Sequence, residues 1–348
     1  MDMYNDVIKE TLRLLQRYRT EWETRYKGYL TKIANNANKQ IALSPPVKKP
    51  LFIYTTVSNE TKTSPKQYLR FMGQNVGILI QKNGNCFLKI SEKDFKNSCT
   101  AFSDYVCDIK PGEYDWAKST EAKRFRDFFA NYNGVKHNDN HEHTVESAFL
   151  TDLEKKKGIN KTLKYIQPVE IRGKRFQMPT PLKASNLHSI NSQADLINDK
   201  FFKYAKQYGG GIDILARRRI ASHTYITVIE LKDKYEENEP PQKAMYQAVA
   251  YATFIRELIR SDAADGIGWY NLFLNKVDGT PPAEVPTELV IKCIVAMPGL
   301  DVKKLDSGLQ NKNLKVLMPF NNSKDRIELY FINLDGNTYS VKDYSAGL

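Results

Sequence analysis

The stretch from Gly209 to Arg260 constrains the fold of this chain more than any other. Residues 225–233 (YITVIELKD) are rich in β-branched and aromatic residues, which is typical of a strand. Residues 211–217 form a second strand-like run, and the spacing between the two runs suits a hairpin. The spacing of apolar residues over 241–260 then predicts a long helix. A hairpin followed by an amphipathic helix predicts that the helix packs on the sheet.

Flanking segments extend this pattern. After residue 141 the sequence predicts a helix at 144–157, strands at 165–171, 175–179, 289–297 and 326–333, and a short helix within 301–313. Before it, we expect an amphipathic helix over 3–35, a linker at 35–49, strands at 51–56, 68–81 and 86–90, and a helix at 116–132. Asn83-Gly84 is a hairpin signal. The polar segment 134–143 marks an expected boundary between an N-terminal α+β region (1–140), for substrate or partner recognition, and a C-terminal α/β domain (141–348).

Charge and composition limit the class of protein. The 348 residues carry a net charge of +12, which favours polyanionic partners because bound phosphates release counterions. No window approaches the roughly 18 apolar residues of a membrane span, and the charged N-terminus lacks the apolar stretch of a secretory signal. We therefore expect a cytoplasmic protein that does not bind membranes. The four cysteines, at 86, 99, 107 and 293, form no zinc pattern and are expected to be free thiols.

Three residues in the hairpin carry a chemical pattern. Asp213 precedes Glu230 by 230 − 213 = 17 residues, so a hairpin can return Glu230 beside it. Glu230 and Lys232 lie two apart in a strand, so both side chains project from one face. Two adjacent carboxylates can share a hard divalent cation such as Mg²⁺, and a nearby lysine can stabilise charge on a phosphate. The alternative is an ordinary surface strand whose Glu and Lys pair with each other.

This pattern resembles the PD-(D/E)XK nuclease superfamily, in which an acidic residue ends one strand and E-x-K lies on the next. Here these match Asp213 and Glu230-Leu231-Lys232. Ile212 stands where the family usually has proline. The resemblance implies a restriction-endonuclease-like core, a mixed central sheet flanked by helices, with Asp213 and Glu230 as ligands of Mg²⁺ or Mn²⁺. It covers about residues 141–300, and the first 140 residues match no family motif.

A second motif lies on the following helix. Gln247-Ala-Val-Ala-Tyr251 resembles the Q-x-x-x-Y motif of RecB-type members, and residues four apart share a helix face. The resemblance implies that Gln247 positions the catalytic groups and that Tyr251 contacts a phosphate. The alternative is a helix whose aromatic residues pack in the core.

Family members also place an acidic residue on the helix before the sheet. Glu146 fits this position because it shares a face with apolar residues; Glu142 and Asp152 are alternatives. Arg217, Arg218 and Arg219 follow Asp213 near the expected hairpin tip and are candidate nucleic-acid-binding residues. Eight basic residues between 154 and 175 form a second basic cluster, for which a solvated surface is an equal alternative.

Together these patterns predict a metal-dependent phosphodiesterase acting on nucleic acid, DNA in preference to RNA, in restriction, phage defence or DNA repair. One alternative is a catalytically silent nucleic-acid-binding protein with the same fold. Another is a subunit of a larger complex, and a homodimer or a partner subunit is compatible with the sequence. Asp213, Glu230 and Lys232 are all present, which favours the enzyme over the silent binder.

Overall fold

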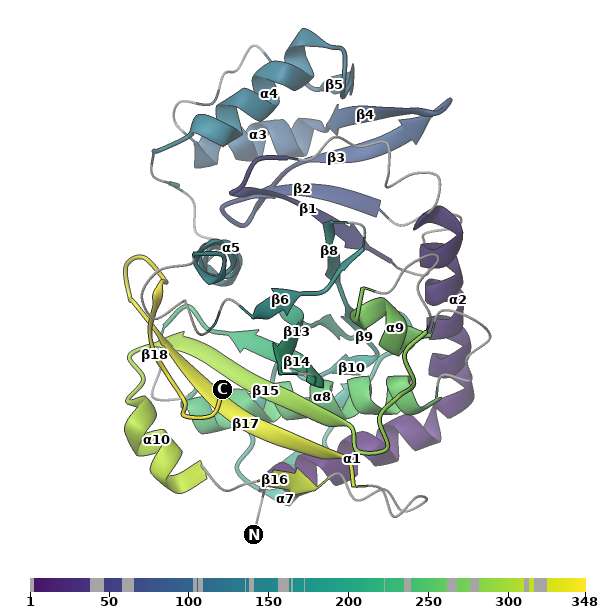
Figure 1. Ribbon diagram of the computed structural model, residues 1–348, viewed down its shortest axis with the longest axis vertical. Helices are drawn as coiled ribbons and strands as arrows, with labels where there is room; N and C mark the ends of the chain where they lie inside the picture. The colour runs from purple at the N-terminus through teal and green to yellow at the C-terminus, as the bar shows by residue number, and fades with distance from the viewer. Residues whose placement is uncertain are drawn as a thin grey trace.

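The computed structural model describes most of the chain: residues 3–37, 47–57, 66–102, 105, 109–134, 136–137, 141–155, 163, 165–171, 173–221, 223–234, 239–261, 268–275, 282–309, 313–315 and 324–348. Two seven-stranded sheets and their helices make up the molecule (Figure 1). The fold is of the mixed α/β class, as the element order predicts.

The C-terminal sheet has the strand order β16-β17-β15-β14-β13-β6, with β18 pairing to β17. Strands β14, β15 and β17 run parallel, while β13, β6, β16 and β18 are antiparallel to their neighbours. Their bounds are β6 Ile166–Pro168, β13 Ile214–Ile220, β14 His223–Leu231, β15 Val290–Pro298, β16 Asn313–Lys315, β17 Arg326–Leu334 and β18 Val341–Tyr344. All nine residues of β15 are buried, as expected of a central strand covered on both faces.

Helices cover both faces of this sheet. Helix α8 (Pro241–Ser261) packs on one face together with α1 (Met3–Arg17) and α2 (Arg19–Ala37), and α5 (His141–Leu153) covers the other face (Figure 1). Alternation along the strands assigns each side chain to a face: Leu215 and Val228 pack on the α8 side, and Ile214 and Ile229 on the α5 side. By the same alternation, Asp213 and Glu230 lie on the α8 side of the sheet.

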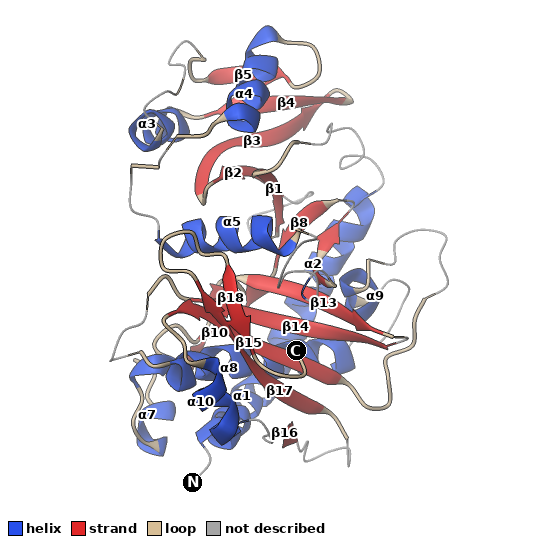
Figure 2. Ribbon diagram, turned by 60° about the vertical axis from the view of Figure 1, so that its left-hand side comes forward, coloured by secondary structure: helices blue, strands red, loops and turns tan. Residues whose placement is uncertain are grey.

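The N-terminal sheet has the order β5-β4-β3-β2-β1-β8-β7. Its strands are β1 Leu51–Thr56, β2 Lys66–Phe71, β3 Gln74–Lys82, β4 Asn85–Ile90, β5 Gly112–Asp115, β7 Glu170–Ile171 and β8 Lys174–Gln177. Helices α3 (Glu92–Ala101) and α4 (Thr120–Asn131) pack on its outer face, and α5 lies between the two sheets (Figure 2). The hairpin at Asn83-Gly84 is confirmed, since both residues have positive φ.

The boundary expected near residue 140 does not separate the hydrophobic cores. Residues of α1 and α2, such as Val7 and Trp22, share one core with α8 and the C-terminal sheet. Conversely, β7 and β8 come from beyond residue 170 but complete the N-terminal sheet, where β8 pairs in parallel with β1. The chain therefore passes between the two sheets more than once: α1 and α2 pack with the C-terminal sheet, β1 to β5 form the N-terminal sheet, and β6 and β7 lie in different sheets.

Most predicted elements are confirmed, with four differences. The strand expected at 165–171 is two strands, β6 in the C-terminal sheet and β7 in the N-terminal sheet. The single helix expected over 3–35 is two helices that meet at Tyr18. Helix α3 was not predicted, although Ser91 caps it by accepting a hydrogen bond from the backbone N–H of Asp94. The expected strand at 68–81 is a hairpin that turns at Met72 and Gly73.

The remaining short elements are β9 Pro179–Thr180, β10 Leu182–Lys183, η1 Leu187–Ser189, α7 Gln193–Leu196, β11 Lys203–Tyr204, β12 Gly210–Gly211, α9 Trp269–Phe273 and α10 Val302–Leu309.

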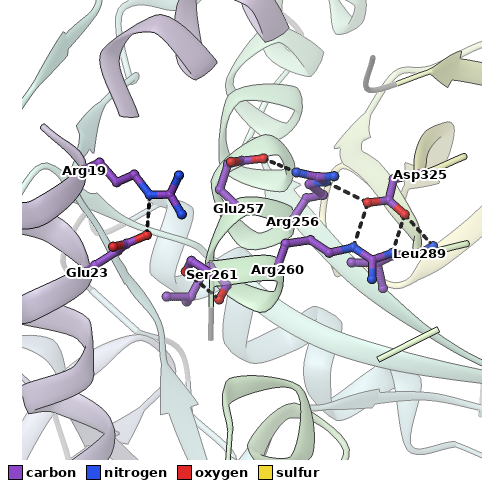
Figure 3. Close-up of polar contacts among 9 residues, drawn as sticks. Arg19, Glu23, Arg256, Glu257, Arg260, Ser261, Leu289 and Asp325 are labelled. Atoms are coloured by element: carbon purple, nitrogen blue, oxygen red, sulfur yellow. Dashed lines mark hydrogen bonds and ion pairs between the residues drawn. The ribbon is translucent and has the colours of Figure 1, made fainter. Parts of the chain in front are cut away.

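A buried ion network joins the C-terminal end of α8 to the sheet (Figure 3). Asp325, fully buried, accepts hydrogen bonds from Nε of Arg256 at 2.7 Å and from Nε and Nη2 of Arg260 at 2.9 and 2.5 Å. It also accepts one from the backbone N–H of Leu289 at 2.8 Å, just before β15. Burial alone raises the pKa of Asp325, but these hydrogen bonds and the two arginine charges hold it below its usual value.

None of the helices in the described ranges has a stretch that is both long enough and apolar enough to span a bilayer. Cys86 and Cys293 are buried free thiols, whereas Cys107 lies outside the described residues.

Candidate active site

The hairpin brings Asp213 and Glu230 together. Ile214 pairs with Ile229 in the β13–β14 ladder, so Asp213, one residue before β13, lies opposite Glu230 near the end of β14. Both side chains lie on the face that α8 covers. The backbone N–H of Leu231 donates a hydrogen bond of 2.9 Å to Oδ2 of Asp213, which fixes that carboxylate against β14. Glu230 is 2% exposed, and its Oε2 has no hydrogen-bond partner among the described residues.

Lys232 follows the last residue of β14 and remains 8% exposed. Its backbone N–H donates to the carbonyl of Ala296 at 3.0 Å, which extends the pairing with β15 by one residue. The ammonium Nζ lies near three carboxylates: Oε1 of Glu230 at 3.2 Å, of Glu239 at 3.1 Å and of Glu142 at 3.7 Å. The lysine is thus held by the strand at its backbone and by carboxylates at its tip.

These contacts shift the pKa values of Asp213, Glu230 and Lys232. Burial, together with the charge of Glu230, raises the pKa of Asp213 well above its usual value. Burial also raises the pKa of Glu230 to about 7, although Lys232 opposes the shift. Burial alone lowers the pKa of Lys232, but the surrounding carboxylates outweigh it and raise that pKa. The site around Asp213, Glu230 and Lys232 therefore has more carboxylate groups than positively charged groups, so a bound cation would be stabilised there.

Helix α8 places Gln247 and Tyr251 on the same side. Nε2 of Gln247 lies 3.5 Å from the Tyr251 hydroxyl, and both side chains are buried. Burial and the charges of Glu230 and Asp213 raise the pKa of Tyr251, so its hydroxyl lies close to both carboxylates. The structure thus brings both residues of the Q-x-x-x-Y motif to the Asp213–Glu230 pair, while their aliphatic neighbours pack in the core.

Gly209, Gly210 and Gly211 allow the backbone before Asp213 to lie close to Tyr251. Gly210 and Gly211 form strand β12, which pairs with β9. A Cβ on Gly210 would lie 2.7 Å from the Tyr251 hydroxyl, and one on Gly209 would lie 2.5 Å from the backbone of Leu182. These positions have no space for a side chain, so the glycines let the backbone before Asp213 reach α8.

Glu146 lies in a different contact network. It is buried, as its apolar face predicts, but its Oε1 accepts a hydrogen bond from the Tyr54 hydroxyl at 2.9 Å and pairs with Nη1 of Arg175 at 3.2 Å. Neither contact belongs to the Asp213–Glu230 centre. Glu142, one helical turn earlier, is the acidic residue of α5 that reaches Lys232. The contacts therefore favour the alternative Glu142; Asp152 is also set apart, since its Oδ2 accepts from the Val341 N–H.

The arginine triplet lies toward the other end of β13. Arg217, Arg218 and Arg219 are four to six residues from Asp213, which corresponds to roughly 13–20 Å along a strand. Arg217 donates to Oε1 of Gln167 and to the carbonyl of Leu274. Arg218 is 6% exposed, on the α5 side of the sheet, whereas Arg219 is exposed. The structure therefore does not bring the triplet to the carboxylates.

The second basic cluster is not a single surface. Lys174 and Arg175 are buried in and beside the N-terminal sheet. Lys155 lies among the described residues and forms an ion pair with Asp152. The five other basic residues of the cluster, Lys156, Lys157, Lys161, Lys164 and Arg172, lie outside the described residues.

Glu239 is the residue that sequence reasoning missed. It lies 9 residues beyond Glu230, just before α8, in an acidic stretch with no motif of its own. Its proximity to Lys232 results from the chain path between β14 and α8, which no spacing rule describes. Tyr208, five residues before Asp213, was also missed, since a single aromatic residue in a loop carries no signal.

The donor set can hold one divalent cation. Asp213 and Glu230 supply two carboxylates, and the orphaned Oε2 of Glu230 is a buried oxygen that lacks a positive partner. Among the described residues, no cluster of three His, Cys, Asp or Glu side chains has metal-binding geometry. Mg²⁺ commonly binds through one or two carboxylates and completes its shell with water and phosphate oxygens, so a two-carboxylate site fits it.

Comparison of the chain with protein-family models, curated proteins and solved structures found no match. The geometry and charge of the centre therefore carry the functional argument.

The raised pKa of Glu230 predicts an effect on stability. Between its usual pKa of 4.5 and about 7, the folded state binds more protons than the unfolded state, so this residue's contribution to stability falls as pH rises through that window. The shift corresponds to about 3 kcal/mol at pH 8, from about 1.4 kcal/mol per pKa unit. We expect Glu230→Gln to raise the free energy of unfolding by about 1–3 kcal/mol at pH 8 and by little at pH 4.5, measured by urea denaturation without metal.

The exposed residue Glu284 provides a control, since Glu284→Gln should leave stability unchanged at both pH values. Addition of Mg²⁺ should stabilise the native chain but not the Glu230→Gln variant. A Glu230→Gln variant that is less stable than the native chain at pH 8 would contradict this account of the buried carboxylate.

Proposed function

We propose that this protein is a divalent-metal-dependent nuclease of the PD-(D/E)XK type, hydrolysing phosphodiester bonds in DNA in preference to RNA. The proposal includes a restriction-endonuclease-like core and action in the cytoplasm. The observation that carries it is the pair Asp213–Glu230, opposite each other at the ends of β13 and β14, with Glu230 buried, Asp213 half-buried and Lys232 beside Glu230.

The residues of the centre divide the chemistry of hydrolysis. A bound Mg²⁺ or Mn²⁺ supplies Lewis-acid polarisation of the phosphate and acidifies a water molecule. Asp213 and Glu230 hold the cation, and the Leu231 N–H keeps the Asp213 carboxylate oriented. Lys232 remains protonated because carboxylates surround it, so it can donate hydrogen bonds to a water molecule or to the charge that develops on phosphate oxygens.

Two residues of α8 support this arrangement. Gln247 is within hydrogen-bonding range of Tyr251, and the Tyr251 hydroxyl lies at the edge of the carboxylate pair. The raised pKa keeps that hydroxyl protonated, so it can donate a hydrogen bond to a phosphate oxygen. Glu239 and Glu142 pair with the Lys232 ammonium and act as positioning residues.

A cleavage assay tests the proposal. Single- and double-stranded DNA and RNA are incubated with the protein in Mg²⁺, in Mn²⁺ and in chelator, at pH 6 and pH 8. We expect cleavage that requires metal and is faster at pH 8, because Glu230 loses its proton near pH 7 and only its ionised form binds a cation well. Binding of nucleic acid with no cleavage in any metal would instead identify a catalytically silent nucleic-acid-binding protein.

A further inference from the structure

One arginine of the N-terminal sheet lies near this centre. Arg70, on β2, keeps 12% of its side chain exposed. Its Nε donates to Oδ1 of Asn75 at 2.9 Å, and its Nη2 donates to Oε1 of Gln177 at 3.2 Å. Both acceptors are neutral amides. They orient the guanidinium without neutralising its charge.

The charge of Arg70 is compensated by one carboxylate and by one aromatic ring. Among the described residues, the carboxylate within ion-pair range is that of Glu146, whose Oε2 is 4.0 Å from Nη1, and the guanidinium carbon lies 4.4 Å from the centroid of the Tyr54 ring. The other oxygen of Glu146 is already engaged by Arg175 and Tyr54. Within the described part of the chain, the buried Nη1 of Arg70 makes no hydrogen bond. A guanidinium in such surroundings gains from an anion that it can contact in place of water.

Two connections relate Arg70 to the Asp213–Glu230 centre. The Gln177 side chain that accepts from Arg70 also reaches Gly211, since its Nε2 would lie 3.6 Å from a Cβ on that glycine. Gly211 is two residues before Asp213. Helix α5 contacts both sites, with Glu146 facing Arg70 and Glu142 facing Lys232 one turn earlier.

Tyr208 occupies the same edge. Its side chain is 55% exposed, unusually open for a large aromatic residue, while its hydroxyl would lie 3.0 Å from a Cβ on Gly211. Burial of the hydroxyl raises the pKa of Tyr208, while Arg70 lowers it and Asp213 raises it, so the phenol lies near both charges. The ring of Tyr208 is therefore exposed, while its hydroxyl is within electrostatic range of both Arg70 and Asp213.

We infer that Arg70 and Tyr208 bind one strand of the substrate beside the scissile bond, Arg70 through a backbone phosphate and Tyr208 by stacking on a base. This inference rests on the proposed function. A planar guanidinium matches phosphate oxygens, and stacking on an exposed ring requires an unpaired base. The substrate at this edge is therefore single-stranded, and the N-terminal sheet takes part in substrate binding through Arg70.

Equilibrium binding tests this inference without relying on cleavage. A fluorescently labelled single strand of about 20 nucleotides, longer than the site of one binding module, and its blunt duplex are titrated by anisotropy in chelator. The proteins are the native chain and the variants Arg70→Gln, Arg70→Lys, Tyr208→Ala and Tyr208→Phe. Arg124→Gln, an exposed arginine on α4, is the charge-matched control. Tyr208 is exposed, so its variants should fold normally, and thermal denaturation checks the Arg70 variants.

We expect Arg70→Gln and Tyr208→Ala each to weaken single-strand binding about tenfold. The slope of log affinity against log salt should fall by about one for Arg70→Gln alone, since one phosphate contact is lost. Arg70→Lys should retain the slope, and Tyr208→Phe should retain the affinity. Native affinity in both Arg70→Gln and Tyr208→Ala, an equal loss in Arg124→Gln, or tighter binding of the blunt duplex would overturn the inference. Binding that depends on both residues but is never followed by cleavage would support the inference and reject the nuclease proposal.

Discussion

Asp213→Ala and Lys232→Ala should each reduce metal-dependent cleavage by about 10²–10⁴-fold while the protein remains folded. Asp213→Ala removes one of two carboxylates available to a cation, and the remaining Glu230 cannot hold it alone. Lys232→Ala removes the ammonium group beside the phosphate position. Initial rates of cleavage in Mg²⁺, with circular dichroism to confirm folding, measure both effects.

Asp213→Asn separates charge from structure. An asparagine oxygen can still accept the hydrogen bond from the Leu231 N–H, but the side chain has no negative charge. We therefore expect it to be as inactive as Asp213→Ala and at least as stable as the native chain, because the raised pKa shows that a neutral group is preferred there. Lys96→Ala, on the exposed face of α3, is the control with unchanged activity. Full activity in both the Asp213 and Lys232 variants would refute the site.

Asp325→Ala should lower the free energy of unfolding by about 3–5 kcal/mol, the largest stability effect that we expect from one substitution. Its carboxylate compensates Arg256, which is 1% exposed, and Arg260, and it satisfies the N–H of Leu289. Without it, the buried guanidinium of Arg256 loses this ion pair, although it retains the one with Glu257. Urea denaturation at pH 7 measures the loss.

The pH dependence of this effect has a definite sign. Because the folded-state pKa of Asp325 is lowered, its stabilising contribution is present above its usual pKa of 3.8 and is lost as pH falls below it. The difference between native chain and Asp325→Ala should therefore shrink in acid. Asp127→Ala, an exposed aspartate on α4, should change stability by less than about 0.5 kcal/mol. A loss of similar size at Asp127 would contradict the network account.

Local sequence patterns identified most of the secondary structure and the face of each strand. The alternation in β14 places Glu230 opposite to Ile229 in orientation, and the helical period places Gln247 and Tyr251 on one face of α8, as expected. These are properties of residues a few positions apart, where backbone geometry alone sets the relation. Closeness in sequence did not mean closeness in space. Arg217, Arg218 and Arg219 follow Asp213 closely in sequence but lie toward the opposite end of β13, because a strand is extended.

The sequence by itself determined the strand hairpin, the long helix after it and the residue types that can bind a cation. Only the tertiary structure decided that Glu142 and Glu239 approach Lys232 and that Glu146 contacts Arg175 and lies near Arg70 instead. These contacts join segments separated by up to 90 residues, as between Glu142 and Lys232 (232 − 142). The distances between these side chains depend on the position of α5 between the two sheets (Figure 2). No local sequence periodicity encodes that packing.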